Sequence, residues 1–158
     1  MEFEGKVAVI TGAGQGLGAG FAKDFARQGA KVVLLGRTLS KVEKVAGEIR
    51  AEGGWALALG CDVGDRDQVK ASFARISAEV GGVDILVNNA AYHRSLSVLD
   101  TSIEEWDKHI DSNLNGTFYC IKAVLPGMVE RRYGKIINIS SSGAKLFFPG
   151  FGAYAASK

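Results

Sequence analysis

The chain has 158 residues, of which 47% are hydrophobic and 23% charged, and its formal net charge is +2. These values are typical of one soluble globular domain that is long enough to bury a real core. The small net charge and the mixed signs along the chain argue against nucleic-acid or membrane partners. No segment has the length of a membrane span and the first residues do not resemble a signal peptide, so we expect a cytoplasmic protein.

The two cysteines, Cys61 and Cys120, lie in apolar stretches and lack the spacing of metal ligands. Buried thiols of this kind are usually reduced in a cytoplasmic protein. We therefore expect neither a disulfide nor a metal site.

The first predicted element is a strand at Lys6–Thr11, because this run is short, apolar and rich in β-branched residues. The glycine-rich stretch Gly12–Gly20 follows directly. The run Phe21–Gln28 then has apolar residues at helical spacing, and Gly29 is placed to end that helix. The chain thus opens with a strand, a glycine turn and a helix.

The same alternation continues along the chain. Apolar runs predict four more strands, at 31–35, 55–59, 83–87 and 135–139. Helical spacing from Leu39 to Ile49 predicts a helix that ends near Gly53-Gly54, and another helix follows that Asp65 caps. Two overlapping capping boxes, Thr101 with Glu104 and Ser102 with Glu105, predict the start of a long helix. Its apolar markers are Trp106, Ile110, Leu114, Phe118, Ile121, Leu125 and Met128, and Pro126 should bend it near its end.

Strands that alternate with helices predict a single α/β domain over 1–158, a doubly wound parallel sheet of the Rossmann type. The expected strand order is 3-2-1-4-5, and ligands of such sheets bind at the carboxyl ends of the strands. All the unusual polar or glycine clusters fall at these ends: Gly12 to Gly18, Arg37, Asp62, Asn88-Asn89 and Ser140 to Ser142.

A glycine turn between a first strand and a first helix lets backbone approach a pyrophosphate closely, and the helix N-terminus supplies free N–H groups. Two registers fit the sequence. Gly14-Gln15-Gly16-Leu17-Gly18-Ala19 matches one fingerprint, and Thr11-Gly12-x-x-x-Gly16-x-Gly18 has another spacing. A turn that only packs the helix on the strand is the alternative.

The second predicted strand ends in Gly36-Arg37-Thr38 and lacks the acid that would hold a ribose 2′-hydroxyl. An arginine there can accept a 2′-phosphate, so NADP(H) is favoured over NAD(H). Arg37 could instead be a solvated turn residue that stacks on adenine. Asp62 is placed for the adenine edge, and an Asx turn at a strand end is its alternative.

The last residues form a second polar cluster. If they are helical, Tyr154 and Lys158 lie one above the other on the same face. An ammonium beside a phenol favours the phenolate, which makes the pair an acid–base device. The alternative is a loop serine, a half-buried tyrosine and a solvated lysine with no joint role.

Together these motifs resemble the short-chain dehydrogenase/reductase family. The resemblance rests on residues spread over the whole chain: Thr11 to Gly18, Asp62-Val63, Asn88-Asn89-Ala90, Asn113, Ser141 and Tyr154-x-x-x-Lys158. Ala91 is a departure, because the family usually has glycine there, and it affects only the shape of that loop.

The resemblance implies roles for individual residues. It makes Tyr154 the general acid/base, Lys158 the residue that holds the nicotinamide ribose, and Ser141 the hydroxyl that positions the substrate oxygen. It makes Asn113 a helix-kinking residue that anchors a water, and Asn89 a structural residue on the cofactor side. The implied cofactor-binding residues are Gly12, Gln15, Gly16, Leu17, Gly18, Arg37, Thr38, Asp62, Val63, Asn89, Ala90, Tyr154 and Lys158.

Neither histidine belongs to a metal set. We expect His93 to be a solvated loop residue, with contact to substrate as the alternative. His109 is expected on the surface of its helix. The loop Leu146–Phe151 suggests an apolar wall of a substrate pocket, although core or oligomer contacts would explain its aromatic residues equally well.

The expected function is hydride transfer between NADP(H), or NAD(H), and a carbonyl or secondary alcohol substrate. A catalytically idle dinucleotide-binding module and a pure assembly subunit are the alternatives. Members of the family continue beyond the residue that Lys158 matches, with further strands and a substrate-covering loop. We therefore expect this chain to be a fragment of a longer enzyme that is a homo-oligomer, a dimer or tetramer.

Overall fold

The computed structural model describes residues 1–158 and contains a five-stranded parallel sheet in the order β3-β2-β1-β4-β5, which confirms the predicted fold class and order. The strands are β1 (Val7–Thr11), β2 (Lys31–Gly36), β3 (Trp55–Gly60), β4 (Ile85–Asn88) and β5 (Lys135–Asn138). β4 begins two residues later than predicted.

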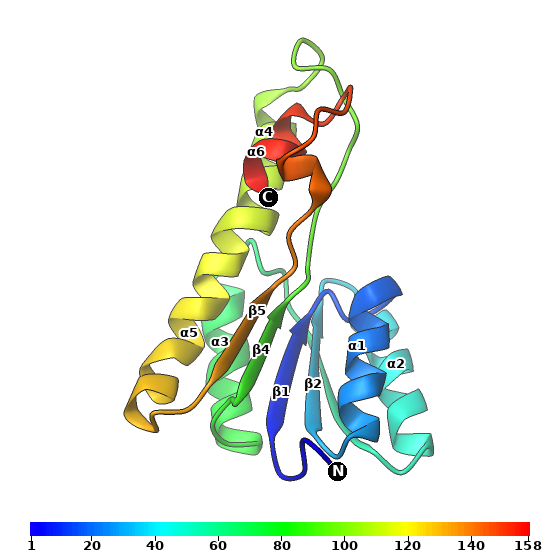
Figure 1. The fold of residues 1–158 in the computed structure, drawn as a ribbon, viewed down its shortest axis with the longest axis vertical. Coiled ribbons are helices and arrows are strands. Elements are labelled where there is room, and N and C mark those ends of the chain that lie inside the picture. Colours follow the sequence, from blue (N-terminus) through cyan, green and yellow to red (C-terminus); the bar gives the residue numbers. More distant parts are fainter.

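Helices cover both faces of this sheet (Figure 1). On one face lie α1 (Gly16–Arg27) and α2 (Leu39–Ala51); on the other lie α3 (Arg66–Glu79) and α5 (Gly116–Glu130). Alternate residues of β1 supply the two cores. Val7 and Val9 pack with residues of α3 and α5, and Ala8 and Ile10 pack with residues of α1 and α2. β1 is apolar along its whole length because both of its faces are buried.

The predicted long helix consists of three parts: α4 (Ile103–His109), a π-helical turn (Ile110–Asn115) and α5. Of the two possible caps the structure uses Ser102, whose Oγ accepts from the Glu105 N–H at 3.2 Å. Thr101 instead donates to the Ser97 carbonyl at 2.7 Å. Pro126 lies inside α5, which continues to Glu130.

The apolar residues that predicted this helix are largely not the ones that it buries. Trp106 is 41% exposed, Leu114 52% and Phe118 56%. The buried stripe consists instead of Glu105, His109, Asn113, Gly116, Cys120, Val124 and Met128. A helix of this composition therefore carries an exposed apolar stripe beside a partly polar buried one.

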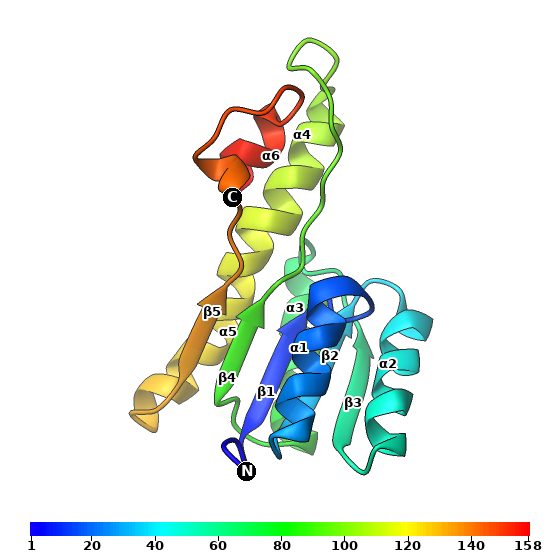
Figure 2. The same ribbon diagram turned by 45° about the vertical axis from the view of Figure 1, so that its right-hand side comes forward.

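The chain segments that leave β4 and β5 extend beyond the sheet (Figure 2). There a 3-10 turn (Ser142–Ala144) and the short helix α6 (Gly152–Ser157) lie beside the α4 end of the long helix. The Leu96 N–H donates to the Gly150 carbonyl at 3.0 Å, so the two segments also contact each other. None of the helices combines the length and the apolar character that crossing a bilayer requires.

Candidate active site

The carboxyl ends of β1 and β4 are joined by side chains as well as by the sheet. Thr11 Oγ1 accepts from the N–H groups of Asn89 (3.0 Å) and Ala90 (2.9 Å). Asn89 Nδ2 donates back to the carbonyls of Thr11 (3.0 Å) and Gly12 (3.3 Å). The predicted role of Asn89 as a structural residue has this geometric basis, because its amide holds the glycine turn against the end of β4.

Two glycines of the turn meet strict steric demands. Gly12 has a φ of +64°, in the region that favours glycine. A Cβ at Gly18 would lie 2.4 Å from the Gly12 carbonyl oxygen. Both belong to the register Thr11-Gly12-x-x-x-Gly16-x-Gly18, so the structure selects that spacing as the one that shapes the turn.

A cleft of about 330 Å³ lies at the carboxyl ends of the strands. Nine of the residues implied for cofactor binding line it: Gly12, Gln15, Gly16, Arg37, Thr38, Asp62, Val63, Asn89 and Ala90. Leu17 and Gly18 do not. Leu17 is 67% exposed, and Gly18 is buried under the turn, where it allows α1 to approach β1. Tyr154 and Lys158 also lie outside the lining of this cleft.

Sequence reasoning missed several lining residues, among them Lys41, Cys61 and Ser112. Lys41 Nζ donates to Gln15 Oε1 at 3.1 Å and so links the start of α2 to the glycine turn. Cys61 precedes Asp62 directly, and burial raises the pKa of its thiol, which makes it a neutral wall of the cleft.

The two helices that begin at the cleft leave their first N–H groups without side-chain caps. Neither Gln15, at the start of α1, nor Thr38, at the start of α2, makes a capping hydrogen bond. By contrast, Asp65 caps α3 through the N–H groups of Asp67 (2.9 Å) and Gln68 (3.1 Å), as predicted. Uncapped N-termini with free N–H groups fit phosphate oxygens.

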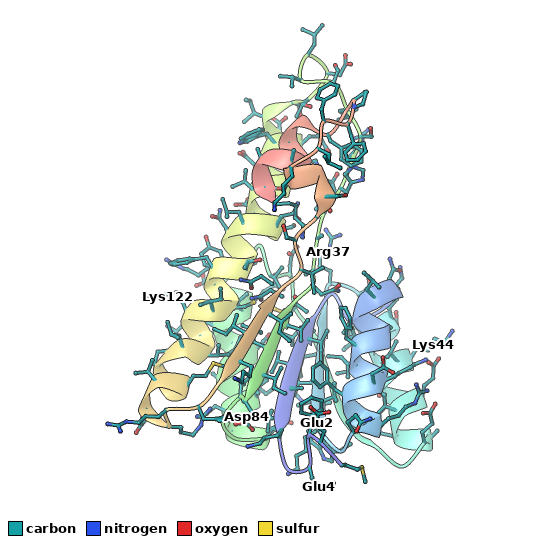
Figure 3. The ribbon with its side chains drawn as sticks, in the orientation of Figure 1. Glu2, Glu4, Arg37, Lys44, Asp84 and Lys122 are labelled. Atoms are coloured by element: carbon teal, nitrogen blue, oxygen red, sulfur yellow. The ribbon has the colours of Figure 1, made fainter.

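Arg37 is exposed at the cleft edge, above the carboxyl ends of β1 and β2 (Figure 3). Asp62 forms the Asx turn that was its alternative interpretation, since its Oδ1 accepts from the Gly64 N–H at 3.0 Å. It also lines the cleft, so the turn does not remove it from the site. These residues, the glycine turn and the free N–H groups together could hold the phosphates and ribose of a dinucleotide.

Ser141 and Tyr154 both lie close to Gly143. A Cβ at Gly143 would lie 3.3 Å from Ser141 Oγ and 3.5 Å from the Tyr154 ring. Ser141 Oγ accepts from the Gly143 N–H at 3.0 Å, which leaves its own proton free to donate. The geometry therefore brings the serine hydroxyl and the tyrosine together beyond the end of β5.

Lys158 follows α6 as its C-cap, one turn after Tyr154. Its ammonium donates to the Ile139 carbonyl at 2.5 Å and makes no hydrogen bond to the phenol. Burial lowers the pKa of this ammonium. The Ser140 hydroxyl donates to the Lys158 carbonyl at 3.1 Å. The two residues that follow β5 therefore bind both the side chain and the backbone of this lysine.

Asn113 is buried in the π-helical turn. Its Oδ1 accepts from the Tyr92 N–H at 2.7 Å, and its Nδ2 donates to the Tyr92 carbonyl (2.9 Å) and to Ser157 Oγ (2.8 Å). One amide thus connects the segment after β4, the long helix and α6. Asn113, for which the resemblance implied a kinked helix, lies in the π-helical turn between α4 and α5.

The prediction for His109 was wrong, because the residue is 1% exposed. It faces the segment after β4 instead of solvent, and its ring lies edge-on to Tyr92 with centroids 4.9 Å apart. His93 is exposed, in line with the prediction. Its ring nevertheless packs against Phe151 and Tyr154, at centroid distances of 4.6 and 4.7 Å.

Residues 6–158 match the family described as short chain dehydrogenase. An uncharacterized oxidoreductase of Mycobacterium bovis is 42% identical over 160 residues, which cover 98% of this chain and 47% of the relative. The oxidoreductase UcpA of Escherichia coli is 44% identical over 155 residues, covering 98% and 59%. The chain thus spans roughly half the length of these relatives.

Solved structures agree with this match. A metagenomic short-chain oxidoreductase in complex with NADP superposes with a TM-score of 0.96 at 38% identity, covering 100% of this chain and 72% of the other. A putative short-chain alcohol dehydrogenase from Sinorhizobium meliloti gives 0.94 at 32% identity, covering 99% and 62%. The chain therefore belongs to the short-chain dehydrogenase/reductase family.

Proposed function

We propose that this chain is part of an oxidoreductase that transfers a hydride between NADP(H) and a ketone or secondary alcohol, with Tyr154 as general acid/base. The observation that carries the proposal is the cleft itself. Two uncapped helix N-termini and Arg37 converge on it, as phosphate groups require. The serine and tyrosine that would handle the substrate oxygen lie beyond the same ends of the strands.

NADP(H) is the proposed cofactor because β2 ends in glycine followed by Arg37, with no acid to hold a 2′-hydroxyl or repel a phosphate. Lys41 adds a second cation to the lining of the cleft. The solved NADP complex of a relative that is 38% identical supports this choice. NAD(H) is the alternative cofactor.

The bound nicotinamide would supply or accept the hydride. The Ser141 hydroxyl would keep its proton and donate a hydrogen bond to the substrate oxygen, which would hold that oxygen beside Tyr154. The phenol would give its proton to that oxygen during reduction and take it back during oxidation. Lys158, one turn further along and held by the Ile139 carbonyl, would bind the ribose of the nicotinamide.

The test uses the full-length protein with NADPH, NADH and a panel of ketones. Y154F should still fold and bind NADPH but lose turnover, since it lacks the proton that the substrate oxygen needs. Tight NADPH binding without turnover of any ketone by the wild type would favour the idle binding module. Substantial turnover by Y154F would contradict the role of the tyrosine.

A matched pair of variants tests the cofactor preference. R37A should weaken NADPH binding by about tenfold to a hundredfold, the value of a hydrogen bond to a charged group, and leave NADH binding unchanged. Lys44 is the control, because it projects from the far side of α2 into solvent (Figure 3) and lies outside the cleft. A wild-type preference for NADH, or an equal loss in K44A, would refute the reading of Arg37.

The exposed apolar stripe on the long helix supports a further part of the proposal, that the full-length protein is a homo-oligomer, a dimer or tetramer. Phe118 and Val129 are 56% and 66% exposed on α5. Apolar patches of this kind favour protein contacts. F118E should shift the mass measured by light scattering to that of the monomer, and an unchanged mass would place the interface elsewhere.

A further inference from the structure

The segment Tyr92–Arg94, called the strap below, is fastened to α4 by two buried side chains that the proposed chemistry does not use. Glu105 is 8% exposed and His109 is 1% exposed. They lie four residues apart, on one face of α4, and both contact the strap. Polar residues are rarely buried without hydrogen-bond partners, and both of these side chains have them.

Glu105 receives three donors. Its Oε2 accepts from the Tyr92 hydroxyl at 2.7 Å, and its Oε1 lies 2.8 Å from Lys108 Nζ and 3.2 Å from Arg94 Nη1. The hydrogen bonds from Lys108 and then Tyr92 lower the pKa of this carboxyl to about 2. Both ends of the strap, Tyr92 and Arg94, are therefore held by a single carboxylate that is charged at neutral pH.

His109 makes a third attachment, and its hydrogen bonds define its tautomer. Its Nδ1 lies 2.7 Å from the Glu105 carbonyl oxygen, which can only accept, so Nδ1 carries a proton. Its Nε2 lies 3.2 Å from the Arg94 N–H, which can only donate, so Nε2 has none. The neutral ring therefore bridges α4 and the strap backbone.

The middle residue of the strap is His93, and its side chain points away from these attachments. Its ring packs against Phe151 and Tyr154, and Phe148 lies 5.4 Å from Phe151. The imidazole is exposed, which leaves it accessible beside the proposed acid/base. The strap is held on both sides of His93, which positions the backbone of this residue, and the packing against Phe151 and Tyr154 positions its ring.

We propose that His93 is a specificity-determining wall of the substrate site and that Glu105 and His109 are positioning residues, which hold the strap so that the imidazole stays against Tyr154. The substituent of the ketone would pack against His93 and Phe151 while its oxygen meets Ser141 and Tyr154. This inference rests on the proposed function. Beyond that function, it identifies His93 as the residue that limits the size of the substituent next to the ketone carbonyl.

The kinetic test compares acetophenone with acetone, using the full-length protein and NADPH. H93A removes the ring and should raise the ratio of kcat/KM for acetophenone over acetone by about tenfold, the usual range for space gained in an apolar pocket. Y92F deletes only the hydroxyl that donates to Glu105. It should shift the same ratio in the same direction by about threefold, because a looser strap holds His93 less firmly.

The double variant separates positioning from general damage. If Tyr92 acts through His93, then Y92F should have no further effect in the H93A background. Y133F is the matched control, because Tyr133 lies on the surface, where its ring contacts Lys6 at 4.1 Å, and it should leave the ratio unchanged. An equal shift from Y92F with and without His93, or no shift in H93A, would overturn the proposal.

A second measurement does not depend on turnover. Nuclear Overhauser contacts between the ring protons of His93 and Tyr154 should be present in the wild type and weaker in Y92F and E105A. The nitrogen NMR spectrum of the histidine side chains should show that His109 is protonated at Nδ1 only. If no ketone is reduced but these signals behave as stated, the proposed function fails while the strap geometry holds. Unchanged ring contacts in both variants would refute the positioning role.

Discussion

Alanine at Gly18 should destabilise the protein, whereas alanine at Gly20 should stabilise it. Both residues belong to α1. A Cβ at Gly18 would lie 2.4 Å from the Gly12 carbonyl oxygen and 2.5 Å from Asn89 Nδ2, but a Cβ at Gly20 would meet nothing within 4 Å. The pair therefore isolates the close approach of the helix to the glycine turn from the helix propensity of alanine.

The expected magnitude follows from two effects. Alanine gains about 0.5–1 kcal/mol of helix stability over glycine at either position, so this gain cancels between the variants. The overpacking at Gly18 costs about 1–3 kcal/mol, because its neighbour is a backbone oxygen that Asn89 also holds. G18A should thus unfold about 2–12 °C below G20A, given about 2–4 °C per kcal/mol for a chain of this size.

The assay is thermal unfolding followed by circular dichroism, together with a titration of the full-length protein with NADPH. G20A should bind NADPH as the wild type does. G18A should bind it more weakly, because the displaced turn no longer presents its N–H groups to the phosphates. Equal melting temperatures for the two variants would refute the argument from close approach.

Three further predictions concern the polar groups. The folded-state pKa of Glu105 is depressed from 4.5 to about 2, so its stabilising effect is present above pH 4.5 and is lost as the pH falls toward 2. Urea unfolding should therefore show the stability advantage of wild type over E105Q shrinking across that window, and a constant advantage would contradict it. D65A should lose about 1 kcal/mol in the same assay through loss of the α3 cap. Burial raises the pKa of Cys120 to about 12, so iodoacetamide should modify this thiol only after unfolding.

The sheet order and the cofactor side of the site follow from local patterns. Each strand is an apolar run that must be buried on both faces, and the clusters after β1, β2, β3 and β4 all line one cleft. A parallel sheet places every strand's carboxyl end at the same edge. Residues that act through their place at a strand end, such as Asn89 and Arg37, can therefore be located from sequence alone.

Partners that depend on how distant segments meet cannot be located in this way. Nothing near Lys158 in the sequence indicates that its ammonium donates to the carbonyl of Ile139, nineteen residues earlier. Lys41 reaches the glycine turn only because α2 begins beside α1. Such contacts depend on distances between elements, about which hydrophobic spacing says nothing.

The long helix shows where pattern reading fails and why the failure is informative. Apolar spacing favours burial of Trp106 and Leu114, yet the structure buries Glu105, His109 and Asn113. All three face the segment that leaves β4, whose backbone and side chains lie beyond the sheet and need polar partners. An amphipathic helix normally buries its apolar residues and exposes its polar ones. This helix does the reverse over part of its length, and such departures are expected at functional sites. The polar stripe of this helix therefore marks the proposed substrate side of the site, just as the glycine turn marks the cofactor side.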